Sequence, residues 1–128
     1  MAASRPLRVL VVDDNTDSVN TLSMLLDLTG HTVRSATDAE SALAIAAEFH
    51  PEVGIFDVGM PGTDGYDLAR HVRNTPWGRA MCLIALTGWG TEEDKGDAAA
   101  AGFDHHITKP VDLELLQKYF SEVEKGEA

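Results

Sequence analysis

The stretch LRVLVVDDN, residues 7–15, decides the fold, because a near-continuous apolar segment ends abruptly in two aspartates. Such a segment is typical of a strand that is buried on both faces of a parallel sheet. Four similar segments follow along the chain, so that five candidate strands cover residues 7–12, 32–36, 53–56, 82–86 and 105–108.

Segments with helical spacing lie between and after these strands. The fourth, residues 91–101, is alanine-rich and only weakly amphipathic. In the other four, the spacing predicts that the following side chains face the core: Leu22, Leu25, Leu26 and Thr29; Ala39, Leu43, Ala46 and Ala47; Leu68, Ala69 and Val72; Leu113, Leu116 and Phe120.

Local signals mark the ends of these helices. The sequence Thr37-Asp38-Ala39-Glu40 fits a capping box, in which Thr37 and Glu40 satisfy backbone donors reciprocally. Gly30 and Gly102 occupy the position that follows a helix C-terminus. Pro51 and Pro76 end the second and third helices.

Strands and helices thus alternate five times with short connections. This alternation predicts an α/β fold, a doubly wound, five-stranded parallel sheet with right-handed crossovers. We expect the flavodoxin-like (βα)5 arrangement with strand order 2-1-3-4-5. The length of 128 residues fits one domain spanning residues 1–128, with its core at about residues 7–123.

Composition and charge narrow the classes of function. The formal net charge of -11 disfavours binding to nucleic acid phosphates. The sequence has no apolar stretch of membrane-spanning length and no signal-peptide pattern at its N-terminus. Its one cysteine, Cys82, provides no disulfide framework, and we expect it to be a buried apolar residue of the fourth strand. We therefore expect a cytoplasmic protein without membrane contact.

Three aspartates are expected to meet at one edge of the sheet. Asp13 and Asp14 end the first strand and Asp57 ends the third, and these strands are neighbours in the expected order. Two charges ~4 Å apart cost about 4 kcal/mol at an effective dielectric of 20, so such a cluster is unfavourable unless a cation binds to it or the pKa of one carboxyl rises. Carboxylates, waters and a phosphate oxygen suit Mg²⁺. The simpler alternative is that each aspartate caps the following helix.

Two more residues lie at strand ends on the same edge. Thr87 ends the fourth strand and Lys109 ends the fifth. A hydroxyl, an ammonium and a metal-bound carboxylate together suit a phosphoryl group. The alternatives are a threonine that caps a loop and a lysine that only pairs with the aspartates.

With these residues the chain resembles the receiver domain of bacterial response regulators, over about residues 7–123. The stretch DVGMPGTDG, residues 57–65, and Lys109-Pro110 are similar to the family's motifs. TPWGR (75–79) and ALTGWG (85–90) resemble receivers of hybrid kinases and single-domain relatives.

The resemblance implies that Asp57 accepts a phosphoryl group from a histidine kinase or a histidine phosphotransfer protein. It implies Mg²⁺ held by Asp13, Asp14, Asp57 and the backbone carbonyl of Gly59. Thr87 and the residue three before Lys109 would then switch the surface of the fourth helix, fifth strand and fifth helix for a downstream protein. Such a receiver phosphorylates and dephosphorylates itself rather than acting as a turnover enzyme.

Three positions depart from the family pattern. Gly59 and the bulky Trp89 occupy positions that govern access of water to the phosphoryl group, and we hypothesise that Trp89 partly covers it. The alternative is a surface aromatic packed on the fourth helix. His106 replaces the usual aromatic at the switch position. His105 and His106 point to opposite faces of the strand, so they are not expected to chelate one ion.

The sequence favours a stand-alone receiver, which we expect to be a monomer or weak dimer, over other classes of function. A haloacid-dehalogenase-type phosphohydrolase needs a second aspartate where this chain has Gly59. A flavin- or nucleotide-binding module needs a glycine-rich loop where this chain has DDNTDS, residues 13–18. A receiver that docks without phosphorylation, or one that is part of a longer protein, stays open.

Overall fold

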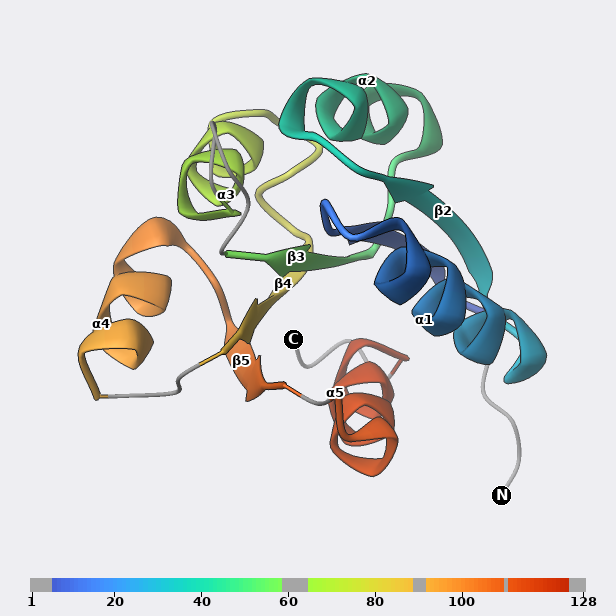
Figure 1. Cartoon of the computed structure of the whole chain (residues 1–128). Helices are drawn as coiled ribbons and strands as arrows, with labels where there is room; N and C mark the ends of the chain where they lie inside the picture. Colours follow the sequence, from blue (N-terminus) through green and yellow to red (C-terminus); the bar gives the residue numbers. More distant parts are fainter. Residues whose placement is uncertain (1–5, 59–64, 89–91, 110, 125–128) are drawn as a thin grey trace.

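The computed structural model describes residues 6–58, 65–88, 92–109 and 111–124. Within them, strands and helices alternate along the chain (Figure 1). In chain order they are β1 (Arg8–Val12), α1 (Thr16–Leu28), β2 (Thr32–Ala36), α2 (Ala39–Phe49), β3 (Val53–Asp57), α3 (Gly65–Arg73), β4 (Cys82–Thr87), α4 (Glu92–Ala101), β5 (His105–Thr108) and α5 (Leu113–Glu124). No helix in the described residues is long and apolar enough to cross a membrane.

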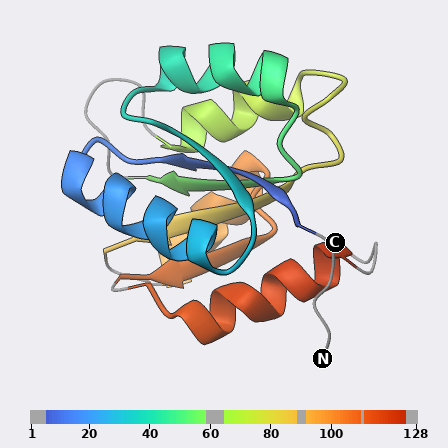
Figure 2. The same cartoon turned by 90° about the vertical axis from the view of Figure 1, so that its right-hand side faces the viewer.

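The five strands form one parallel sheet in the order β2-β1-β3-β4-β5, which confirms the predicted fold class and strand order (Figure 2). At the carboxyl edge, Val12 of β1 lies opposite Phe56 of β3, and Asp57 lies opposite Leu86 of β4. This register brings the ends of β1, β3 and β4 to the same level.

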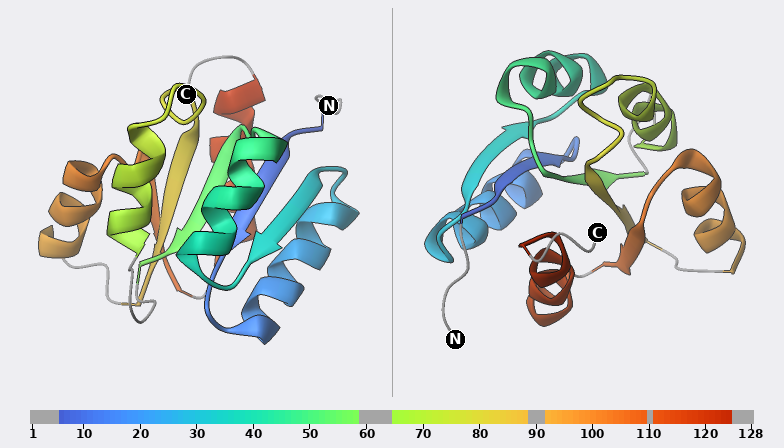
Figure 3. Two further views of the ribbon diagram at one scale, coloured as in Figure 1. Left: turned by 90° about the horizontal axis from the view of Figure 1, so that it is seen from above. Right: turned by 180° about the vertical axis from the view of Figure 1, so that it is seen from behind.

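Helices cover both faces of the sheet (Figure 3). Alternate side chains of β1 point to opposite faces of the sheet. Val9 and Val11 pack in the core under α1 and α5, whereas Leu10 and Val12 pack in the core under α2, α3 and α4. All four are fully buried, which explains why the strand reads as a continuous apolar segment.

The helix ends follow the local chemistry, with one correction. Gly30 and Gly102 have φ angles of 98° and 107°, as expected for glycines that follow a helix. The predicted capping box at Thr37 is wrong by one residue. Asp38 is the N-cap of α2, and its side chain accepts the backbone N–H of Ser41.

The buried helix faces also differ in part from the prediction. In α2, Ala42 is buried and Ala47 is exposed, the reverse of what the spacing indicated. In α1, Thr29 is the exposed C-cap, while Val19 is a core residue that the prediction missed. The predicted faces of α3 and α5 are confirmed, since Leu68, Ala69, Val72, Leu116 and Phe120 are buried and Leu113 is half-buried. Cys82 is buried as expected, and burial raises the pKa of its thiol to about 12.

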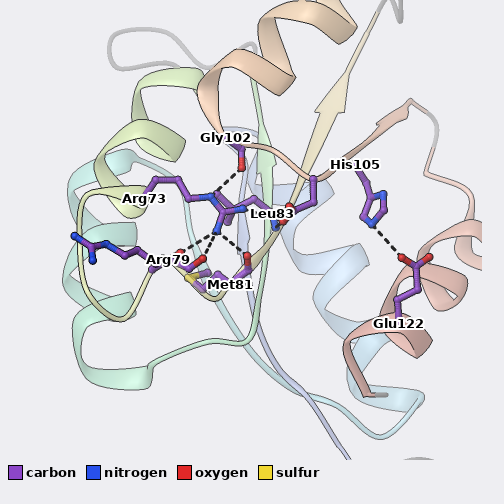
Figure 4. Close-up of polar contacts among 9 residues, drawn as sticks. Arg73, Arg79, Met81, Leu83, Gly102, His105 and Glu122 are labelled. Atoms are coloured by element: carbon purple, nitrogen blue, oxygen red, sulfur yellow. Dashed lines mark hydrogen bonds and ion pairs between the residues drawn. The ribbon is translucent and has the colours of Figure 1, made fainter. Parts of the chain in front are cut away.

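At the edge of the sheet opposite the carboxyl ends of the strands, Arg73 joins several segments of the chain (Figure 4). Its guanidinium donates to the carbonyl oxygens of Gly78, Arg79, Met81 and Gly102. It also pairs with Asp104 at 2.8 Å. The end of α3 is thereby tied to the segment before β4 and to the connection between α4 and β5.

Candidate functional site

The three predicted aspartates come together at the carboxyl edge of the sheet. Asp13 directly follows β1 and Asp57 ends β3, and their side chains are only 3% and 9% exposed. Asp14 is exposed, yet each of the three offers a carboxylate oxygen within 4.8 Å of the others. The alternative that they cap helices does not hold, because Asn15 is the N-cap of α1 and α3 begins only at Gly65.

Lys109 supplies a positive charge to this cluster. Its Nζ lies 3.3 Å from Oδ2 of Asp57 and 3.6 Å from Oδ2 of Asp13. The backbone N–H of Lys109 also donates to the carbonyl oxygen of Thr87 at 2.7 Å, which ties the end of β5 to the end of β4. One ammonium thus lies beside two of the three carboxylates, those of Asp13 and Asp57.

The surroundings of Asp13 leave this cluster short of positive charge. Burial raises the pKa of Asp13, and the neighbouring Asp57 raises it further. The backbone N–H of Asn15, which donates to Oδ1 at 3.0 Å, and the Lys109 ammonium act in the opposite direction on that pKa but do not cancel the increase. An additional cation would relieve the repulsion between the carboxylates.

The side chains present fit Mg²⁺. The ion prefers a few carboxylate oxygens and keeps several waters, which agrees with two buried aspartates and one exposed. No other group of three potential metal-ligating His, Cys, Asp or Glu side chains occurs among the described residues. The predicted fourth ligand, the carbonyl of Gly59, and the predicted cover, Trp89, lie outside the described residues.

Thr87 contributes a buried hydroxyl at the end of β4. The residue is 3% exposed, and its Oγ1 has no hydrogen-bond partner within the part of the chain that the structure describes. A buried donor without an acceptor is costly, by about 1–3 kcal/mol, and is uncommon in folded proteins. The site therefore contains an unused donor next to an acidic cluster.

The two histidines of β5 have different surroundings. His105 stacks on Tyr119 of α5, with 3.7 Å between the ring centroids. Its Nε2 lies 3.6 Å from Oε1 of Glu122 (Figure 4). His106, the predicted switch residue, is half-buried and lies opposite Ala85 of β4. His105 thus packs against α5.

Two features near the site were not predicted from the sequence. A cavity of about 430 Å³ lies beside Asp13 and Lys109, with apolar walls that include Leu22, Leu25 and Val111. Leu22 and Leu25 were predicted to face inward, but the cavity depends on how α1 packs beside the segment between β5 and α5. The second feature is the close approach of Gly65 to the main chain of Asp57.

Comparison with known proteins identifies the family. Residues 9–121 match the model of the response regulator receiver domain, so the chain belongs to this family, as the resemblance predicted. Domains of this family are generally signalling modules of two-component systems rather than turnover enzymes.

Individual relatives agree with this assignment. The chain is 38% identical to an uncharacterized 14.6 kDa protein of Leptolyngbya boryana, over 87% of this chain and 88% of the relative. It is 35% identical to the two-component response regulator PhoP of Pseudomonas aeruginosa, over 87% of this chain but only 48% of PhoP. Among solved structures, the chemotaxis protein CheY4 of Vibrio cholerae is similar with a TM-score of 0.86 and 30% identity, over 92% of this chain and 98% of CheY4.

Proposed function

We propose that this protein is a phospho-receiver that accepts a phosphoryl group onto Asp57, with Mg²⁺ bound, from a histidine kinase or a histidine phosphotransfer protein. The observation that carries the proposal is the placement of the buried Asp57 carboxylate. It lies in contact distance of the Lys109 ammonium and beside the Asp13 and Asp14 carboxylates.

The transfer uses Asp57 as a nucleophile. An oxygen of its carboxylate forms a bond to phosphorus, and the bond from phosphorus to the donor's imidazole nitrogen breaks. The electron pair of that bond stays on the imidazole, which takes up a proton. The Lys109 ammonium and the Thr87 hydroxyl stabilise the charge on the phosphoryl oxygens.

Asp13, Asp14, Asp57 and the backbone carbonyl of Gly59 would hold the Mg²⁺. When bound, the ion supplies the positive charge that the repelling carboxylates and the incoming phosphoryl group require. Hydrolysis, in which water attacks phosphorus and the Asp57 carboxylate leaves, returns the protein to its resting state. We propose that Gly59 and Trp89 set the access of this water. If Trp89→Ala left the lifetime of the phosphorylated protein unchanged, shielding by Trp89 would be wrong.

The output is a changed surface. The backbone N–H of Lys109 donates to the Thr87 carbonyl and so couples the ends of β4 and β5. A movement of Thr87 toward the phosphoryl group would therefore displace the end of β5. His106, half-buried on β5, is the proposed partner in this switch. The population shift would alter the α4-β5-α5 surface for a downstream protein. We propose a cytoplasmic monomer or weak dimer that binds no nucleic acid or membrane.

The test is phosphorylation by a small donor. The protein is incubated with Mg²⁺ and acetyl phosphate, and its intact mass is measured, with Asp57→Asn as the control. A phosphoryl adduct that needs Mg²⁺ and is absent from the variant supports the proposal. No adduct, together with no binding of beryllofluoride, would refute it and favour a receiver that docks without phosphorylation.

A further inference from the structure

Gly65, the first residue of α3, lies against the strand end that carries Asp57. A Cβ atom on Gly65 would lie 2.5 Å from the carbonyl oxygen of Asp57 and 2.7 Å from Cα of Val58. It would also lie 3.0 Å from the carbonyl carbon of Asp57. All of these are main-chain atoms, so no change of rotamer relieves the contact. Only glycine therefore fits here without moving the main chain.

The same stretch of main chain is fixed from the other side by β4. Asp57 lies opposite Leu86, and the backbone N–H of Val58 donates to the carbonyl oxygen of Leu86 at 3.1 Å. Residues 57 and 58 are thus held between β4 and the start of α3. Because the aspartate side chain is short, a shift of this main chain moves the carboxylate relative to Lys109.

We propose that Gly65 is a positioning residue for the acceptor site: by lacking a side chain, it lets α3 close on the main chain of Asp57 and set the place of that carboxylate. The proposal rests on the proposed function of Asp57. Restoring an ordinary contact at Gly65 requires a movement of about 0.9 Å, from 2.5 Å to 3.4 Å. A misplacement of about 1 Å at a reacting group can slow a reaction by about a hundredfold.

Gly78 offers a matched control at the opposite edge of the sheet. A Cβ on Gly78 would also collide with main-chain atoms, the carbonyl oxygen and carbon of Val72. Its own carbonyl accepts a hydrogen bond from Arg73, far from the aspartates in the fold. A Cβ on Gly78 would lie 1.9 Å from the Val72 carbonyl oxygen, closer than the 2.5 Å contact at Gly65, so Gly78→Ala introduces a backbone clash that is at least as severe without touching the main chain of Asp57.

The experiment compares Gly65→Ala with Gly78→Ala in the full chain. Mg²⁺ affinity is measured by isothermal titration, and the rate constant of phosphorylation by acetyl phosphate is measured from intact mass. The melting temperature reports the loss of stability. We expect Gly65→Ala to phosphorylate at least tenfold more slowly and to bind Mg²⁺ more weakly, whereas Gly78→Ala stays within twofold of the parent on both. Equal effects of the two variants, or a folded Gly65→Ala within twofold of the parent, would overturn the proposal.

A spectroscopic readout separates this inference from the proposed function. In an amide ¹H–¹⁵N spectrum, Gly65→Ala is expected to shift the Asp57, Val58 and Leu86 signals, and Gly78→Ala is expected to leave them in place. If the parent protein is not phosphorylated, the proposed function fails, and unchanged Asp57 and Val58 signals would overturn the positioning role by themselves. Trimethylamine N-oxide and low temperature give a destabilised variant its best chance to fold. If Gly65→Ala stays unfolded there while Gly78→Ala folds, the close approach of Gly65 to Asp57 is needed for the whole fold. That outcome would also contradict a positioning role of Gly65.

Discussion

Replacing Arg73 by methionine tests how the fold is held at the edge of the sheet away from the site. The substitution keeps an unbranched apolar stem and removes the guanidinium. Four carbonyl oxygens lose a donor, those of Gly78, Arg79, Met81 and Gly102. Gly78 and Met81 are both buried, but the Gly78 carbonyl also accepts the backbone N–H of Met81 at 3.3 Å and keeps that bond, so the Met81 carbonyl is the buried acceptor that depends most on Arg73.

The magnitude follows from these differences in burial. A buried acceptor that loses its donor costs about 1–3 kcal/mol, and this cost applies to the Met81 carbonyl. The ion pair with Asp104 adds about 0–1 kcal/mol, because the Asp104 side chain is 39% exposed and keeps the N–H of Leu83. Allowing for relaxation, we expect Arg73→Met to lower the free energy of unfolding by about 2 kcal/mol. For a domain of this size the melting temperature would fall by roughly 7 °C.

The assay is urea unfolding followed by circular dichroism, with the slope of the free energy against urea checked for two-state behaviour. Arg70→Met is the matched control on the same helix. Arg70 forms one exposed ion pair, with Asp67 at 2.7 Å, and its loss should cost less than about 0.5 kcal/mol. A loss below about 1 kcal/mol in Arg73→Met, or one equal to that in Arg70→Met, would refute the account of Arg73 as the main tie between these segments.

Three further predictions concern the site and the core. Asp13→Asn, measured without metal, should raise the melting temperature at pH 7. Burial raises the pKa of Asp13 above 3.8, so the folded protein binds a proton at this carboxyl more tightly than the unfolded chain does. The folded protein therefore loses stability as the pH rises from 3.8 through the raised pKa, and the substitution removes this loss. The gain should shrink near pH 4, and an increase there instead would contradict the sign. Thr87→Val should raise the free energy of unfolding by about 1 kcal/mol in thermal unfolding, because it removes a buried hydroxyl without a partner among the described residues. The same substitution should slow phosphorylation by acetyl phosphate. A loss of stability would show that the hydroxyl has a partner. Cys82 should not react with a thiol reagent in the native state at pH 8, since burial raises its pKa to about 12, and labelling at the rate of the urea-unfolded chain would contradict this.

The sequence predicted the strands and the meeting of the site residues for the same physical reason. In a parallel sheet each strand delivers its last residue to one edge, so Asp57, Thr87 and Lys109 could be placed together from their positions alone. The strands at residues 32–36 and 105–108 have the predicted bounds, and the bounds of the other three agree to within one residue at each end. The roles of these residues stay predictions until phosphorylation is measured.

The errors arose where several residues satisfy the same local rule. Thr37 and Asp38 can both cap a helix, and only the backbone conformation, extended at Asp38, decides between them. Ala42 and Ala47 give no contrast in hydrophobicity against their alanine neighbours, so the periodicity of α2 was ambiguous. The contacts of Arg73 could not be predicted, because its partners come from separate segments that meet only in the folded chain.

The carboxyl edge of the sheet holds the candidate site, and the opposite edge holds contacts that stabilise the fold. At the carboxyl edge, buried carboxylates repel, and the Thr87 hydroxyl has no partner among the described residues. At the other edge, one arginine satisfies carbonyls from several segments. Groups that destabilise the resting fold are the ones that a cation and a phosphoryl group would satisfy, so binding energy there is available to shift the protein between two states. Because the Arg73 contacts lie at the opposite edge, they can hold the frame of the fold while the carboxyl edge rearranges.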